Sequence, residues 1–249
     1  MPRRKEKFTQ DRPYHVMSRA VEGREVFSKE EDCARFLFLL YAANIGSPAP
    51  NLHRVNIQEA AKQLLEGSSQ EHLVKPEHSP LVEIFSFVLA RDHYHLGLVP
   101  TSANGITQYM QKVNLGFAKY YNLKYERRGS LFEGRFRIIS IRTPVELDAV
   151  VRYINVKNVL DVYDVNWEYK GIDDEDSAIR FLKEYPYSSF SDLFLQRSSF
   201  LLSPASRFEL KKLLKDDFKA GKDSYQKIFE YYITKKDKLF HHVFLDATI

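Results

Sequence analysis

Two apolar segments separated by a short polar break, FVLARDHYHLGLVP over residues 87–100, most constrain the fold of this 249-residue chain. The first segment begins at Leu81, so the pattern predicts strands over 81–90 and 93–99 joined by Arg91-Asp92. A connection this short pairs two strands antiparallel. The chain is therefore expected to contain an antiparallel or mixed sheet built around this hairpin.

Strand and helix patterns alternate on either side of the hairpin. Beside it, the predicted elements in chain order are a strand over 13–20, a helix over 28–46, a helix over 103–125, a strand over 135–141 and a helix from 144 towards 159. Ser28 is the predicted cap of the first helix, and Pro144 suits the first turn of the last. This order predicts an α+β domain.

Composition divides the chain into three parts. Residues 47–80 contain SPAPN and a polar stretch, and they are expected to form an insertion with one amphipathic helix over 56–66. We expect residues 1–160, with this insertion, to form the main domain. Residues 161–249 are expected to form an irregular and then helical, Lys-rich C-terminal region.

The cysteine count and the lack of long apolar runs predict a cytoplasmic protein. Cys33 is the single cysteine, so no intramolecular disulfide can form, which suits a reducing compartment. No apolar run approaches the roughly 20 residues of a membrane span. The basic start MPRRKEK is followed by no apolar signal core.

Basic residues are concentrated between positions 112 and 142, although the net charge is only +4. Only Glu126 and Glu133 oppose them, and tyrosine and phenylalanine lie between them. The basic residues are Lys112, Lys119, Lys124, Arg127, Arg128, Arg135, Arg137 and Arg142. Such a pattern favours contact with a nucleic-acid backbone, and an ordinary solvated surface is the alternative.

Two histidines, His93 and His95, open the second strand of the hairpin. Residues i and i+2 of a strand point to the same side, so the two imidazoles project together and Tyr94 points into packing on the other side. Two ligands are too few for a structural zinc site, but they suit an open site for a divalent ion. Packing alone is the alternative explanation of the pair.

Tyr153 lies on the predicted helix VELDAVVRYINVKNVL with apolar residues around it. A buried structural tyrosine is the simplest interpretation. A tyrosine can also act as a nucleophile towards phosphorus beside a bound metal.

Five segments in order resemble the single-tyrosine HUH transposases: YHVMSRA, FVLARDHYHLGLVP, GFAKYYNLKYERRGSLFEGRFR, VVRYINVKNVL and YPYSSF. HUH denotes His, a bulky hydrophobic residue and His, here His93, Tyr94 and His95. The resemblance covers roughly residues 11–192 and is closest to the REP-associated, IS200-like tyrosine transposases, which handle palindromic repeats of bacterial genomes.

The resemblance implies a fold, a reaction and a cofactor. The fold is a ferredoxin-like α+β core, an antiparallel sheet with helices on one face, with a helical C-terminal appendage outside the resemblance. The reaction is metal-dependent cleavage and rejoining of single-stranded DNA beside a hairpin, in DNA transposition and recombination. Tyr153 would form a 5′-phosphotyrosine and leave a free 3′-OH, and His93 and His95 would bind Mg²⁺ or Mn²⁺. A bacterial, nucleoid-associated monomer or homodimer is implied.

Two positions depart from the family pattern. The amide residue expected one helical turn after the tyrosine is Lys157, which cannot ligate a metal when protonated but could contact the scissile phosphate. Asn158 is about 140° round an α-helix from Tyr153, a poor position unless the helix is distorted. The usual Pro-Asn before the first histidine is Arg91-Asp92, and Asp92 either orients an imidazole or only forms the turn.

Several further residues are candidates for the site or for DNA contact. His15 and Arg19 on the first strand match the family's opening strand, and each has a structural alternative. Phosphate contacts are expected from Arg19, Lys119, Lys124, Arg127, Arg128, Arg135 and Arg137. Base stacking is open to Tyr120, Tyr121, Phe132 and Phe136, although the helical spacing of Tyr120 favours a core position.

Two other functions remain open from the sequence. A protein that binds a DNA hairpin without cutting it is favoured by Lys157 in the place of an amide ligand. A metal-dependent nuclease that uses water would leave Tyr153 with a structural role only.

Overall fold

The sheet of this protein is antiparallel and four-stranded, in the order β4-β5-β1-β6. The structure is a computed structural model, and it describes residues 8–48, 56–68 and 74–213. The strands are β1 (Tyr14–Arg19), β4 (Val82–Leu89), β5 (His93–Pro100) and β6 (Arg137–Ser140). With α1 (Glu30–Ile45) after β1 and α3 (Gly105–Lys124) after β5, the chain order is that of the ferredoxin-like motif. The α+β class and the antiparallel sheet are confirmed.

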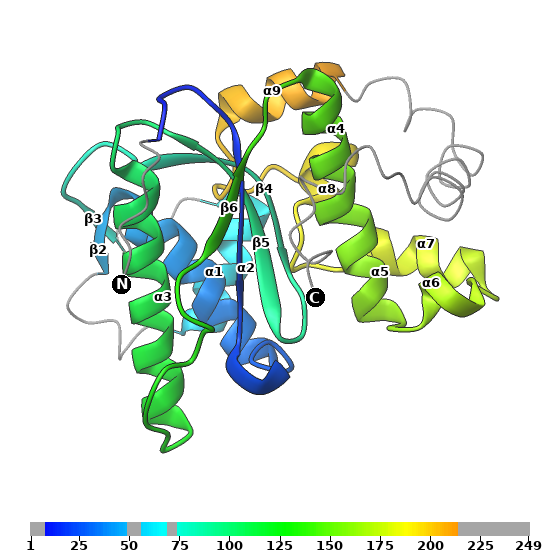
Figure 1. Ribbon diagram of the computed structural model, residues 1–249, viewed down its shortest axis with the longest axis horizontal. Coiled ribbons are helices and arrows are strands. Elements are labelled where there is room, and N and C mark those ends of the chain that lie inside the picture. Colours follow the sequence, from blue (N-terminus) through cyan, green and yellow to red (C-terminus); the bar gives the residue numbers. More distant parts are fainter. Residues whose placement is uncertain (1–7, 49–55, 69–73, 214–249) are drawn as a thin grey trace.

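Helices cover both faces of the sheet (Figure 1). On one face, Tyr94 of β5 contacts Phe36 of α1, with 4.6 Å between ring centroids. On the other face, His95 contacts Tyr153, which directly follows α4 (Pro144–Arg152). The prediction of helices on one face is therefore incomplete. The helix after the edge strand β6 folds back across the histidine side, because its own apolar residues need cover.

A close contact between the two strands of the hairpin, β4 and β5, requires glycine at position 97. Phe85, in an irregularity of the β4–β5 register, lies so close that a Cβ atom on Gly97 would be 2.3 Å from its ring. The Phe85 side chain is itself buried, so it has little room to move.

Gly97→Ala is expected to lower the free energy of unfolding by about 1–3 kcal/mol through overpacking. Urea denaturation of the purified variant measures this. Adding Phe85→Leu to the same chain should recover part of the loss, because the smaller side chain makes room for the methyl group. A Gly97→Ala variant as stable as the wild type would contradict the contact.

The described part of the predicted insertion contains one helix and a short strand pair. They are α2 (Ile57–Glu66), β2 (Gly46–Pro48) and β3 (Val74–Pro76). Leu64 of α2 packs with Phe38 of α1 in a small cluster of its own. A short 3-10 helix, η1 (Val21–Gly23), follows β1.

After α4 the chain continues as short helices that share the main core. They are the π-helical segment η4 (Tyr153–Lys157), α5 (Asn158–Tyr163), α6 (Trp167–Lys170), α7 (Glu175–Glu184), α8 (Phe190–Phe194) and α9 (Pro204–Leu213). Trp167 and Phe190 belong to the same buried cluster as the sheet. The domain boundary at residue 160 stays a prediction, and residues 214–249 of the predicted appendage lie outside the described part. None of the helices in the described ranges is long and apolar enough to span a membrane.

The YPYSSF segment covers the outer edge of β4. The backbone N–H of Leu89 donates to the Tyr187 carbonyl at 2.9 Å, and that of Ser189 donates to the Phe87 carbonyl at 2.8 Å. Val88 and Ser188 form the bridge between these bonds. The segment thus satisfies hydrogen-bonding groups that an edge strand would otherwise expose.

Candidate active site

Three histidines lie together on the sheet face that α4 and η4 cover. In the register of β1 and β5, His15 and Met17 lie opposite Gly97 and His95, so His15 shares a face with His93 and His95. The Nε2 atom of His15 and the Nδ1 atom of His95 are 2.8 Å apart. The rings of His93 and His95 are nearly perpendicular, with centroids 5.1 Å apart. His15 thus holds the ring of His95, as a neighbour in the predicted site.

Asp92 in the hairpin turn orients the other imidazole. Its Oδ1 atom is 2.6 Å from His93 Nδ1, and its Oδ2 atom is 3.4 Å from Arg19 Nη1. Burial raises the pKa of Asp92, but the hydrogen bond to His93 and the charges of His93 and Arg19 outweigh it, so the net pKa is lowered. Asp92 is therefore a carboxylate that fixes His93, and Arg19 lies beside that carboxylate.

The ring of Tyr153 lies against the imidazoles. Its centroid is 5.5 Å from that of His95 and 5.8 Å from that of His15, and both contacts are close to perpendicular. The side chain is almost fully buried, at 3% exposure. The tyrosine ring therefore meets His95 of the predicted pair together with its neighbour His15.

A π-helical turn begins at Tyr153 and brings Asn158 to the histidines. In η4, the backbone N–H of Asn158 bonds the Tyr153 carbonyl, five residues earlier, which widens the turn relative to an α-helix. Asn158 Oδ1 lies 3.2 Å from His93 Nε2, and Asn158 Nδ2 donates to the Tyr153 carbonyl at 2.9 Å. The α-helical geometry places Asn158 on the wrong side, and the observed distortion corrects its position.

The residues around His93 fit a divalent ion by their donor chemistry. The Nδ1 atoms of His93 and His95 have Asp92 and His15 as partners, so each ring would bind a metal through Nε2, with its other nitrogen fixed from outside. Asn158 Oδ1 would add an amide oxygen. Within the described residues, no group of three or more His, Cys, Asp or Glu side chains could hold a metal, so His93 and His95 would need a donor of another kind, such as this amide.

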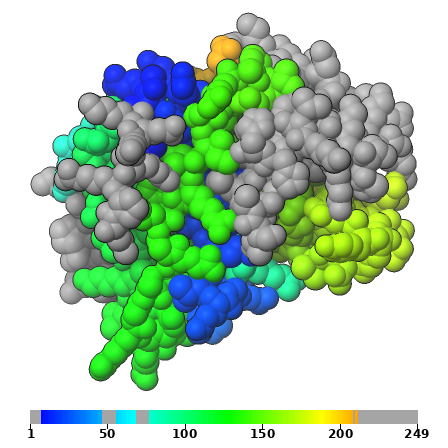
Figure 2. Space-filling model, in the orientation of Figure 1, coloured from blue at the N-terminus to red at the C-terminus, as the bar shows by residue number. Residues whose placement is uncertain are grey.

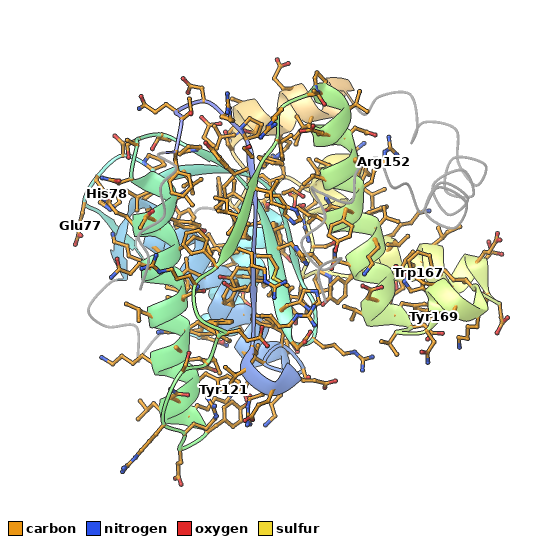
Figure 3. All side chains as sticks on the ribbon, in the orientation of Figure 1. Glu77, His78, Tyr121, Arg152, Trp167 and Tyr169 are labelled. Carbon is orange, nitrogen blue, oxygen red and sulfur yellow. The ribbon has the colours of Figure 1, made fainter. Side chains whose placement is uncertain are left out.

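Lys157 is engaged by carboxylates. Its Nζ atom is 2.6 Å from Asp161 Oδ2 and 3.7 Å from Glu168 Oε1, and it also lies 5.6 Å from the centroid of the Tyr153 ring. Asp161 in turn accepts from the indole N–H of Trp167 at 2.8 Å, on the helical group at the right of Figure 3. These contacts hold Lys157 beside the tyrosine, and its catalytic role stays a prediction.

The arrangement of elements is similar to one that has been solved. The fold is similar to that of a REP-associated tyrosine transposase. The comparison is with a structure of that protein bound to a REP hairpin, at 9% sequence identity and a TM-score of 0.44, and it covers 78% of this chain and 85% of the other. No protein-family model and no curated protein matches the sequence.

Some of the predicted DNA-contacting residues are exposed, and others are bonded to groups of the protein itself. Lys119, Arg128 and Arg135 are exposed, and Arg137 is half-buried on β6. In Figure 2 the chain from α3 through β6 to α4 runs along the visible surface. Arg127 instead donates to Asn122 Oδ1 at 2.7 Å near the end of α3.

Lys124 is paired with two carboxylates, and its contact with a DNA phosphate stays a prediction. Its Nζ atom lies 2.6 Å from Asp32 Oδ1 and 2.5 Å from Glu31 Oε1 on α1. Two carboxylates of α1 offset the charge of Lys124. They are far from Lys124 in the sequence, so local patterns could not predict the pairing.

Two of the aromatic residues that were candidates for base stacking lie in the core of this structure. Tyr121 and Phe132 are buried, at 6% and 5% exposure. Tyr120 is half-buried and donates its hydroxyl to Asp32 at 2.8 Å, whereas Phe136 is half-buried on the approach to β6. The helical periodicity of α3 accounts for Tyr121, whereas Phe132, beyond the end of α3, packs on Phe117 and Tyr94.

Asn155 is a residue of the site region that the sequence did not single out. It lies inside η4, is fully buried, and bonds Ser86 of β4 and Ser189 at the start of α8. The available signal was an amide residue between the apolar Ile154 and Val156, in a segment shared with Asn158.

Proposed function

We propose that this protein is a metal-dependent transesterase that cleaves and rejoins single-stranded DNA beside a hairpin. The observation that supports it most directly is the contact of the Tyr153 ring with His95, whose Nδ1 atom is held by His15. The ring of His93, whose Nδ1 atom is held by Asp92, lies beside that of His95. A structural tyrosine needs no such arrangement of oriented histidines. The family resemblance of the sequence segments points to the same chemistry.

In the proposed step, the Tyr153 phenol oxygen attacks a DNA phosphorus atom. The phenol gives up its proton as its oxygen bonds to phosphorus. The bond from phosphorus to the 3′ oxygen of the preceding nucleotide breaks, and that oxygen leaves as a 3′-OH after it takes up a proton. The 5′-phosphate stays on the tyrosine, and attack by a 3′-OH reverses the step. No bond energy is lost to hydrolysis, so rejoining needs no external energy source.

His93, His95 and Asn158 are the residues that would hold the divalent ion, either Mg²⁺ or Mn²⁺. When bound, the ion withdraws charge from the phosphate oxygen and offsets the negative charge that develops there. Asp92 and His15 hold the two imidazoles in the ligating orientation. Lys157 lies close enough to the tyrosine ring to place a positive charge near the phosphate once Asp161 and Glu168 release it.

A labelled hairpin tests this function directly. Hairpins with single-stranded flanks, built from palindromic repeats of the source genome, carry a label at the 3′ end. Incubation with the protein and Mn²⁺ should give a covalent protein–DNA band on a denaturing gel. The same DNA labelled at the 5′ end should give a shorter free strand and no labelled protein, because the 5′ fragment leaves with the 3′-OH.

The chelator EDTA and an unflanked duplex are the matched controls, and both should give no band. Hairpin binding without any covalent band, whichever repeat is used, would contradict the proposal. It would instead favour a binding protein.

A further inference from the structure

A buried polar network joins the π-helical segment to the sheet. Asn155, Ser86 and Ser189 all have 0% exposure. Asn155 Nδ2 donates to Ser86 Oγ at 2.8 Å, Ser189 Oγ donates to Asn155 Oδ1 at 2.6 Å, and the two serine oxygens are 3.2 Å apart. Ser189 Oγ also accepts from the Phe87 N–H at 2.9 Å. The hydrogen-bonding atoms of the Asn155 amide are thus satisfied by groups from two other parts of the chain.

Asparagine side chains also donate hydrogen bonds to the backbone in and beside the π-helical turn. Asn155 Nδ2 also donates to the Val151 carbonyl at 2.8 Å, and Asn158 Nδ2 donates to the Tyr153 carbonyl at 2.9 Å. A π-helical turn departs from the i→i+4 ladder of an α-helix, and the Tyr153 carbonyl accepts both the backbone N–H and the side-chain amide of Asn158. Two asparagine side chains supply donors on either side of Ile154, where the helix changes register.

An apolar side chain would fill the position of Asn155 without the cost of burying an amide. Burying polar groups is favourable only when all of them are bonded, and a fully bonded network then admits few alternative registers. The network therefore specifies a register more than it adds stability. The register that it specifies is the one in which Asn158 faces His93.

We propose that Asn155 is a positioning residue of the active site. Its amide, held by Ser86 and Ser189, selects the π-helical turn that brings Tyr153 and Asn158 to the histidines. The catalytic consequence of this inference depends on the proposed function. The structural consequence, the placement of Asn158 against His93, does not.

Asn155→Leu is the decisive variant, because it keeps the side-chain volume and removes the amide. The rate of covalent adduct formation is expected to fall about 10²-fold, as a small misplacement of reacting groups can cost that much. The ¹⁵N resonance of His93 Nε2 is expected to shift, because Asn158 leaves it. Urea denaturation of the same sample measures how much stability is lost.

Asn44→Leu is the matched control. Asn44 also bridges a helix to β4, through Val82 N–H and carbonyl at 3.0 and 2.9 Å, but it lies at the other end of that strand. This variant should lose stability while it keeps the wild-type adduct rate and the His93 resonance. If Asn155→Leu keeps both as well, or if the two variants lose activity in proportion to their stability, the positioning role is wrong.

A second pair of variants keeps the inference testable if Asn155→Leu does not fold. Ser189→Ala removes the donor to Asn155 and should lower the adduct rate and shift the His93 resonance, and Ser189→Thr should restore both. Failure of the threonine variant to restore what alanine removed, or no loss with alanine, would overturn it. If the wild type forms no adduct at all, the proposed function fails, and the His93 resonance still decides the positioning role.

Discussion

Tyr153→Phe is expected to abolish covalent capture of hairpin DNA, a loss of more than about 10³-fold in adduct yield, as expected for removal of a nucleophile. The variant lacks only the phenol oxygen, and its ring can keep the perpendicular contacts with His15 and His95. Hairpin affinity should therefore stay at the wild-type value. Denaturing gels of the 3′-labelled hairpin measure the adduct, and native gels measure the binding.

Tyr163→Phe is the matched control for this prediction. Tyr163 lies at the end of α5, half-buried against Phe181 with 5.4 Å between ring centroids. It should keep the adduct. Cleavage that continues in Tyr153→Phe would show that water is the nucleophile, and it would assign Tyr153 the structural role that the sequence left open.

Asp32→Ala is expected to lower the free energy of unfolding by about 3 kcal/mol, the size of effect that follows when one partner of a buried ion pair is removed. Asp32, in the first turn of α1, is 2% exposed. Its Oδ1 atom accepts from Lys124 at 2.6 Å and from Tyr120 at 2.8 Å, and its Oδ2 atom accepts from Tyr125 at 2.6 Å. Removal of the carboxylate leaves three donors of α3 and its end without this acceptor.

Thermal unfolding measures this loss, and for a chain of this size the midpoint should fall by about 6–12 °C. Glu66→Ala is the control. The Glu66 carboxylate is more than half exposed, and its ion pair with Lys62 is long, at 3.9 Å. Such an exposed pair contributes little to stability. Asp32→Asn keeps an acceptor without the charge and should lie between the two. Equal midpoints for Asp32→Ala and Glu66→Ala would refute the role of this cluster.

Local patterns predicted most of the elements that carry the site. The hairpin, both helices of the ferredoxin-like core and the helix that begins at Pro144 are observed within a few residues of their predicted bounds. The cap of α1 is an exception: it is Lys29, and the Ser28 hydroxyl donates to Glu25 Oε2 at 2.8 Å. Helix and strand periods are properties of neighbouring residues, so they can be read without the fold.

Partners that are distant in sequence were not predictable in the same way. The basic run suggested Lys124 as a phosphate contact, but Asp32, 92 positions earlier, binds it. His15 was a candidate for the site because of its strand, yet only the register of β1 on β5 places its ring 2.8 Å from His95. Charge and hydrogen bonding act over a few ångströms of space, and the fold determines which groups come within that distance.

By itself, the sequence determined that His93 and His95 share one face of a strand, because the side-chain period of a strand is two. It also placed Tyr153 on the helix after β6. Only the tertiary structure decided that Asn158 lies beside His93. In a regular α-helix this side chain would point away from the site. In η4 the Asn158 N–H bonds the carbonyl five residues earlier, and this wider turn brings the side chain to His93. The physical reason lies in the buried contacts of Asn155 with Ser86 and Ser189, which come from segments that no local pattern connects.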